Sequence, residues 1–424
     1  MLRNKYFQHK ETIHNFIWRA MQIGAKQGTT FLIFFIAAYF LIPEDLGLFS
    51  YLMAIVGLLL IICDFGLSPS VSKYVAELKT TKSKNLNKIL FSISIVIMIL
   101  STLVSLFIIF FGKHIFEDYK LILYFLPYLF FLPLSSVADG IYRGLKEFKK
   151  LSIINIAIAI FVIPLSFLLI KTYGMIGAII SQNILFLLLA ICLFIFRKET
   201  KFKFDKKITK KILKYALIIG FTGIAYYMYN KADILILKYF DYIVEIGYYE
   251  ILNKIFSIIF IPFIIFGQII APNITRLYIQ KKFINIKKKF LKHLLIIFFM
   301  GIFLSITLYF LMPLLIKLFL EKYFVPETIL ILNLLLLILP FRIIASVVSQ
   351  GHTIATGNAH FSLWTMIPAG IVNVILDIIF ISKFGFIGVV YSTLICYVFA
   401  TISFIMLYYF KLNRLIKRGN SETC

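Results

Sequence analysis

Long apolar runs, separated by short clusters of charged residues, follow one another along the entire chain. A run of about 18 or more apolar residues is typical of a helix that crosses a membrane. The pattern therefore predicts an all-α integral membrane protein with about twelve transmembrane helices. We expect these helices at residues 14–41, 46–66, 89–111, 121–142, 151–170, 174–196, 213–239, 247–270, 292–316, 326–348, 361–382 and 386–410.

The composition agrees with this pattern and limits what else the chain can hold. Of 424 residues, 61% are hydrophobic and only 15% are charged, which lies outside the range of water-soluble globular proteins. Twelve spans of about 22 residues use about 264 residues and leave about 13 for each connection. That excludes a sizeable catalytic domain outside the membrane, and we expect the protein not to be an enzyme. The first apolar run is too long for a removable signal peptide, so we expect it to remain in the mature protein.

Positive charge is unevenly distributed between the two sets of connections. The chain has 44 Lys and Arg against 19 Asp and Glu, a formal net charge of +25. When the connections are assigned alternately to the two sides, 32 of these cations fall on one side and 7 on the other. Cytoplasmic loops carry the excess of Lys and Arg. Both termini are therefore predicted to be cytoplasmic, in a multi-pass protein of the cell (inner or plasma) membrane.

Short segments of the first half recur in the second half in the same order. Four pairs match at offsets of about 200 to 213 residues: 43–49 with 243–249, 68–74 with 271–278, 144–148 with 357–361, and 173–181 with 384–392. Transporter folds are often built from such internal repeats. The matches predict a 6+6 repeat, with one six-helix bundle at residues 1–200 and a second at 201–424.

Several of these segments resemble a known family. Asn15 to Arg19, Pro43 to Gly47, Asp64 to Leu67 and Tyr142 to Lys146 are similar to the polysaccharide transporter or O-antigen flippase family, within the multidrug, oligosaccharidyl-lipid and polysaccharide exporter superfamily. The resemblance implies two six-helix bundles around a central cavity that opens alternately to either side. It implies a substrate, an oligosaccharide linked to undecaprenyl pyrophosphate, that is moved to the outer leaflet for surface polysaccharide biosynthesis. A polysaccharide polymerase and glycosyltransferases are the protein partners that this function would involve.

Five cations fall inside the predicted spans, namely Arg19, Lys26, Lys231, Lys254 and Arg342. Each would cost roughly 2.5 to 3.5 kcal/mol if it faced lipid unpaired. We therefore expect these side chains to face protein or water. Together with Gln22, they are the predicted substrate-binding residues, because Arg and Lys suit a pyrophosphate.

The first span carries the clearest polar stripe. Asn15, Arg19, Gln22 and Lys26 lie on one helical face, and the glycines at positions 24 and 28 would allow a neighbour or a ligand to approach closely. The alternative is that the cations only form ion pairs between helices. Asp139 and Arg143, four residues apart, are expected to form such a pair.

Acidic and aromatic residues leave further alternatives open. Asp233, Glu250 and Asp377 are candidates for proton or sodium coupling, and Lys231 and Asp233 need partners on other helices because residues two apart do not face each other. The tyrosines at positions 226, 227 and 229 could stack on sugar rings, although ordinary packing is the preferred interpretation.

Other classes of function fit the sequence less well. A cation-coupled multidrug exporter of the same fold would favour a cavity dominated by acids and aromatic residues, whereas the cations inside the predicted spans suit an anionic substrate better. A membrane glycosyltransferase or polysaccharide polymerase could use Glu44 and Asp45, or Glu117 and Asp118, but the outer loops are too short to hold a sugar-nucleotide site. Nucleic-acid binding is excluded because the basic runs lie between spans. We expect no cofactor and no metal, since the cysteines are scattered and His352 and His360 are eight residues apart.

Overall fold

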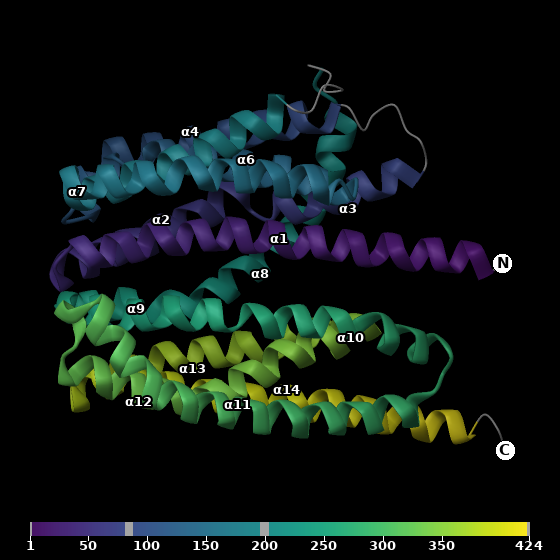
Figure 1. Cartoon of the computed structure of the whole chain (residues 1–424). Coiled ribbons are helices and arrows are strands. Elements are labelled where there is room, and N and C mark those ends of the chain that lie inside the picture. Colours follow the sequence, from purple (N-terminus) through teal and green to yellow (C-terminus); the bar gives the residue numbers. More distant parts are fainter. Residues whose placement is uncertain (1, 81–87, 196–202, 422–424) are drawn as a thin grey trace. The chain divides into compact units, whose positions relative to one another are not determined.

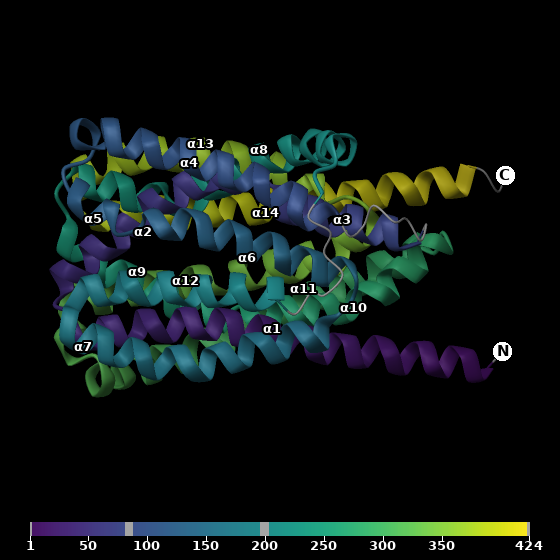
Figure 2. The ribbon, with the colours of Figure 1, turned by 90° about the horizontal axis from the view of Figure 1, so that it is seen from above.

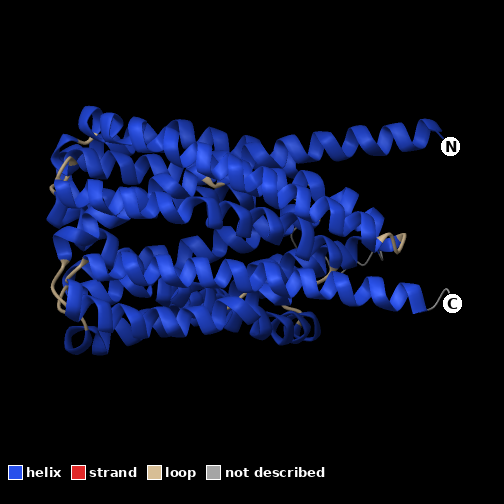
Figure 3. Cartoon of the chain, turned by 90° about the horizontal axis from the view of Figure 1, so that it is seen from below, coloured by secondary structure: helices blue, strands red, loops and turns tan. Residues whose placement is uncertain are grey.

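The computed structural model describes residues 2–80, 88–195 and 203–421. Within these ranges the chain consists of helices and short turns, and no strand occurs among them (Figure 3). The prediction of an all-α protein is therefore confirmed. The boundary predicted between the two bundles, at residues 200 and 201, lies outside the described residues and stays a prediction.

The chain forms two compact units. Unit 1 comprises residues 1–41 and 52–224, and unit 2 comprises residues 42–51 and 225–424. The first eight helices are α1 (Leu2–Phe40), α2 (Pro43–Asp64), α3 (Leu67–Thr80), α4 (Ile89–Ile115), α5 (Tyr119–Leu123), α6 (Leu126–Gly144), α7 (Phe148–Ile195) and α8 (Lys206–Tyr239). In unit 1, α1 packs along α7, and α6 packs against both α3 and α7 (Figures 1 and 2).

Unit 2 is built mainly from the remaining helices. These are α9 (Ile243–Ile259), α10 (Ile261–Ile279), α11 (Phe283–Phe319), α12 (Pro326–Val348), α13 (His360–Phe384) and α14 (Ile387–Ser421), with short segments η2 (Glu321–Tyr323), η3 (Ser349–Thr353) and η4 (Ile354–Thr356). Here α13 packs along α14, and α12 packs against both α11 and α14 (Figure 1). The core of this unit contains large aromatic side chains such as Phe290, Tyr323 and Tyr408.

Eleven helices of the described chain are long and apolar enough to cross a membrane, where the sequence predicts twelve. The difference lies in α7, which spans 48 residues and includes two of the predicted spans, 151–170 and 174–196. Gly174 interrupts it with a non-helical backbone (φ 56°, ψ −131°). A Cβ atom on Gly177 would lie 2.0 Å from the carbonyl oxygen of Leu169. Residues eight apart in a straight helix are about 12 Å apart along its axis, so the chain folds back at Gly174 as a tight helical hairpin.

The same hairpin recurs between α13 and α14. Gly385 has φ 65° and ψ −155°, and a Cβ on Gly388 would lie 2.3 Å from the carbonyl carbon of Phe380. Each of these residues follows its counterpart in α7 by 211 positions. Glycine is required at the turn because its φ is positive, and at the close approach because a side chain would collide with backbone. The sequence match between 173–181 and 384–392 thus corresponds to one shared backbone geometry.

The helices extend beyond the predicted spans. Residues 271–292, which lie between two predicted spans and contain seven Lys and Arg, are mostly helical: α10 and α11 continue into this range and leave only residues 280–282 between them. Lysine is a good helix former, so a basic cluster marks the end of the apolar run rather than the end of the helix.

Candidate functional site

A cavity of about 340 Å³ in unit 1 gathers the polar face of α1. We call it the unit 1 cavity, and its lining comes from three helices: Arg19, Gln22, Ile23, Lys26, Gln27 and Thr30 on α1, Ser68 on α3, and Ser136, Asp139 and Arg143 on α6. The three sequence-predicted residues of the first span therefore lie together. The side chain of Asn15, the fourth member of the predicted stripe, lies outside the described residues.

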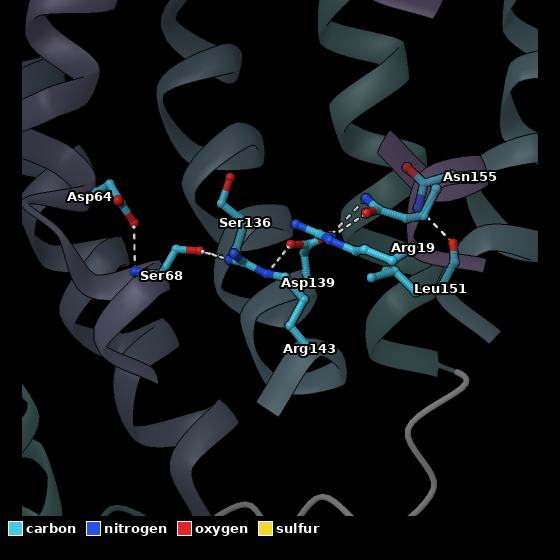
Figure 4. Close-up of polar contacts among 9 residues, drawn as sticks. Arg19, Asp64, Ser68, Ser136, Asp139, Arg143, Leu151 and Asn155 are labelled. Atoms are coloured by element: carbon cyan, nitrogen blue, oxygen red, sulfur yellow. Dashed lines mark hydrogen bonds and ion pairs between the residues drawn. The ribbon is translucent and has the colours of Figure 1, made fainter. Parts of the chain in front are cut away.

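Hydrogen bonds join the three helices across this cavity (Figure 4). Arg19 donates to the side-chain oxygen of Gln22, and Gln22 Nε2 donates to Asp139 Oδ1 at 3.2 Å. Arg143 Nε lies 2.7 Å from Asp139 Oδ2, which confirms the predicted ion pair. Arg143 Nη2 also donates to Ser68 Oγ at 3.0 Å, so one carboxylate and one guanidinium hold α1, α6 and α3 in register.

Positive charge exceeds negative charge in the unit 1 cavity. Arg19, Lys26 and Arg143 line it together with a single carboxylate, that of Asp139. Among the described residues, no carboxylate oxygen lies within 4 Å of Lys26 Nζ, whose nearest aromatic partner is the ring of Phe186 at 5.9 Å. With these four groups ionised the cavity carries two uncompensated positive charges, which makes it a site for an anion.

Gly24 and Gly28 of α1 were expected to allow close approach of a neighbouring helix or a ligand, and no helix of the described chain approaches them closely. A Cβ atom built on Gly24 or on Gly28 would meet no described atom within 4 Å. Neither glycine is needed for helix packing in this structure, so a close approach there would have to come from a ligand.

Lys231 and Lys254 of unit 2 share one acid. Lys231 Nζ lies 2.6 Å from Glu250 Oε1, and Lys254 Nζ lies 4.0 Å from the same oxygen. Glu250 is 3% exposed, and its Oε2 atom has no hydrogen-bond partner among the described residues. The structure therefore places these two predicted substrate-binding cations in an ion-pair cluster between α8 and α9, outside both cavities described here.

Asp233 and Asp377 are buried without a cationic partner within 4 Å in the described part of the chain. Tyr249 Oη donates to Asp233 Oδ2 at 2.5 Å. Asn373 Nδ2 donates to Asp377 Oδ2 at 2.9 Å, and Ser392 Oγ donates to the other oxygen of Asp377. A buried carboxylate with no cationic partner stays ionised only at a cost, which uptake of a proton or binding of a cation would relieve.

A second cavity, of about 300 Å³, lies within unit 2, and we call it the unit 2 cavity. Arg342 is its one charged lining residue, and the guanidinium carbon lies 4.6 Å from the ring centre of Phe260 and 4.7 Å from that of Tyr397. The remaining lining is aromatic, aliphatic or neutral polar: Tyr226, Tyr229, Asn230, Ile264, Ala345, Ser346, Ser349, Gln350, Ser362, Thr365, Met366, Ala400, Thr401 and Phe404. Of the three clustered tyrosines, Tyr226 and Tyr229 line the cavity and Tyr227 does not.

Sequence reasoning missed a histidine pair. His293 Nδ1 on α11, which is half-buried, and His352 Nε2 on η3 lie 3.0 Å apart, and the His352 ring packs against those of Phe290 and Tyr408. His352 falls between the predicted spans 326–348 and 361–382, and in the structure it is fully buried. The sequence carries no signal for the pair, because the two residues are 59 positions apart. In the residues that the structure describes, no three His, Cys, Asp or Glu side chains gather as a metal site would require.

Comparisons with known proteins place this geometry in context. A family model described as polysaccharide biosynthesis protein matches residues 12–278, which is more than half of the chain. The chain is 26% identical over 393 residues to an uncharacterized membrane protein of Methanocaldococcus jannaschii, covering 87% of this chain and 91% of that protein.

Two solved structures share the fold. An inward-facing multidrug resistance MATE family transporter of the MOP superfamily matches with a TM-score of 0.77 and 16% identity, over 94% of this chain and 99% of that one. The lipid II flippase MurJ, in an inward closed conformation, matches with a TM-score of 0.68 and 22% identity, over 95% of this chain and 89% of that one. At these identities the likeness concerns the fold alone.

Proposed function

Because the chain belongs to the polysaccharide biosynthesis protein family, we propose that it moves an oligosaccharide linked to undecaprenyl pyrophosphate from the cytoplasmic to the outer leaflet of the cell membrane. It does so by alternating access, to supply surface polysaccharide biosynthesis, and acts as a transporter rather than an enzyme. The similarity in fold to a lipid II flippase supports a lipid-linked substrate.

The observation that carries this proposal is the charge of the unit 1 cavity. Three cations surround one carboxylate there, and Lys26 has no acidic partner within 4 Å among the described side chains. Arg19 and Arg143 offer planar forks of donors for phosphate oxygens, and Lys26 offers a point charge. In this proposal Arg19, Gln22 and Lys26 bind the pyrophosphate, and Arg143 joins them.

The membrane potential favours the proposed direction. With the cytoplasm negative, outward movement of an anion gains roughly 2.3 kcal/mol per charge per 100 mV. The proposed topology has twelve spans with both termini in the cytoplasm, when the two limbs of the α7 hairpin are counted as separate spans.

A cysteine placed at position 45 or 118 should be labelled from outside the cell, and labelling only from the cytoplasmic side would overturn this topology.

Asp233 and Asp377 are the proposed ion-coupling residues, and the burial of both carboxylates without a cationic partner within 4 Å among the described residues supports binding of a proton or a sodium ion. Glu250 is a weaker candidate because Lys231 already neutralises it at 2.6 Å. An ion bound there would add a second driving force to the membrane potential.

The function is tested by reconstitution. The purified protein in liposomes should transfer a fluorescent pyrophosphate-linked oligosaccharide across the bilayer, and Lys26→Ala should reduce the rate at least about tenfold by removing a charge-assisted contact. Lys150→Ala is the matched control, since Lys150 is 64% exposed and pairs with Glu147 of the same turn. Export of cationic drugs with no lipid transfer would instead establish the alternative, a cation-coupled multidrug exporter of the same fold.

A further inference from the structure

The unit 2 cavity differs in chemistry from the unit 1 cavity. Its lining holds a single charged side chain, Arg342, and among the described residues no carboxylate oxygen lies within 4 Å of that guanidinium. Five aromatic rings line the same space, at Tyr226, Tyr229, Phe260, Tyr397 and Phe404. This combination is unsuited to a cationic ligand, because the one charge present would repel it.

The guanidinium of Arg342 is held in place but leaves its donors unused. Its carbon atom lies over the rings of Phe260 and Tyr397, at 4.6 and 4.7 Å from the ring centres. A cation–π contact uses the charge of a guanidinium and consumes none of its N–H donors. None of its N–H groups donates a hydrogen bond within the part of the chain that the structure describes. Five donors fixed in one plane match a carboxylate or a phosphate placed at that edge.

The rest of the lining suits a hydroxylated ring. Amide and hydroxyl groups that can both donate and accept line the cavity at Asn230, Ser346, Gln350 and Thr365. Asn230 is itself oriented, because Tyr397 Oη donates to its Oδ1 at 3.1 Å. Tyr226 is 60% exposed, so its ring is open to stacking. The volume, about 300 Å³, lies at the small end of the range for small-molecule sites, which is the scale of one or two sugar rings.

We propose that the unit 2 cavity is a glycan subsite that binds a sugar ring carrying an anionic substituent, a carboxylate or a phosphate. The inference rests on the proposed function and names part of its substrate: the transported oligosaccharide contains an acidic sugar. The aromatic rings stack on the sugar, the amides and hydroxyls bond its hydroxyl groups, and Arg342 pairs with its negative charge. Arg342 then contributes to selection of the glycan rather than to recognition of the carrier pyrophosphate.

The test uses soluble probes that carry no lipid, so that sugar binding and pyrophosphate binding are measured separately. NMR titration of the full-length protein in detergent compares a disaccharide containing glucuronate, its neutral counterpart containing glucose, a glucose phosphate and inorganic pyrophosphate. The acidic disaccharide should bind at least about tenfold more tightly than the neutral one, as expected for a charge-assisted contact. Arg342→Gln should abolish that difference, and Arg342→Lys should restore part of it.

The controls separate the subsite from the transport function. Lys150→Ala, which changes an exposed lysine outside both cavities, should leave the preference for the acidic sugar intact, whereas Lys26→Ala should weaken pyrophosphate binding only. Equal binding of the acidic and neutral disaccharides, or loss of pyrophosphate binding alone in Arg342→Gln, would overturn the proposal. A protein that binds the acidic disaccharide but transfers no lipid-linked oligosaccharide would keep the subsite and refute the proposed function.

Discussion

The hairpin at Gly174 makes a sharp prediction about Gly177. In Gly177→Ala the new Cβ atom would lie 2.0 Å from the carbonyl oxygen of Leu169 and 2.5 Å from its carbonyl carbon. Ordinary van der Waals contact begins at 3.4 Å, so the two limbs of the hairpin must separate by about 1.4 Å. The obstacle is backbone, which cannot move aside by a change of rotamer.

Overpacking of this kind costs about 1 to 3 kcal/mol, and a backbone obstacle places the substitution at the upper end of that range. For a unit of roughly 200 residues, 1 kcal/mol corresponds to about 2 to 4 °C in melting temperature. Gly177→Ala should therefore lower the midpoint of thermal inactivation by about 6 to 12 °C. The midpoint is measured by heating a fluorescent-protein fusion in detergent and recording the monodisperse fraction by size-exclusion chromatography.

Gly24→Ala is the matched control within the same unit. Its Cβ would meet no described atom within 4 Å, and alanine favours a helix over glycine by about 0.8 to 1 kcal/mol, so the midpoint should stay constant or rise. Gly388→Ala, at the corresponding point of the second hairpin, should behave like Gly177→Ala. An unchanged midpoint in Gly177→Ala would refute the fold-back at Gly174 and leave α7 as one long helix.

Three further outcomes are expected. Glu250→Gln should lower the thermal midpoint, because Lys231 and Lys254 lose the carboxylate that they share. Adding Lys231→Met to this variant should recover part of the loss. If the two substitutions instead lowered the midpoint by the sum of their separate effects, the ion-pair cluster would be contradicted. Since both lysines are about one third exposed, the loss should be about 1 to 3 kcal/mol rather than the larger value of a fully buried pair. Asp377→Asn should remove any dependence of lipid transfer on sodium or on a proton gradient while the protein remains folded; retained dependence would exclude this acid as the coupling site. Asp139→Asn should tighten binding of inorganic pyrophosphate about two- to tenfold in calorimetry, because it removes the one carboxylate from the unit 1 cavity, and weaker binding would argue against an anion site there.

Patterns in the sequence predicted those structural features whose cause lies in residues close together along the chain. The polar face of α1 follows from helical spacing, and the Asp139–Arg143 pair follows from residues four apart on one helix. The repeat at 173–181 and 384–392 was visible because the same two glycines are needed for the same backbone geometry. In each case the cause lies within a few residues of its effect.

Contacts between distant segments could not be read in this way. Tyr249 bonds Asp233 and His293 meets His352 because helices pack side by side, and no spacing in the sequence encodes those neighbours. The prediction that Lys231 and Asp233 need partners on other helices was right, but the partners were identified only in the structure. The basic cluster at residues 287–289 lies between two predicted spans but inside α11, because charge marks the end of an apolar run and not the end of a helix.

The five-residue π-helix η3 has a mechanical consequence. Ser349 and Gln350 face the unit 2 cavity, while His352, two residues later, is buried against His293. A π-helical turn holds one residue more than the matching α-helical turn, and an α-helix turns by about 100° for each residue. A change from π to α register would rotate Ser349 and Gln350 relative to His352 by about 100°. The present orientation of the cavity lining and the present histidine pair therefore require the π-helical turn between them.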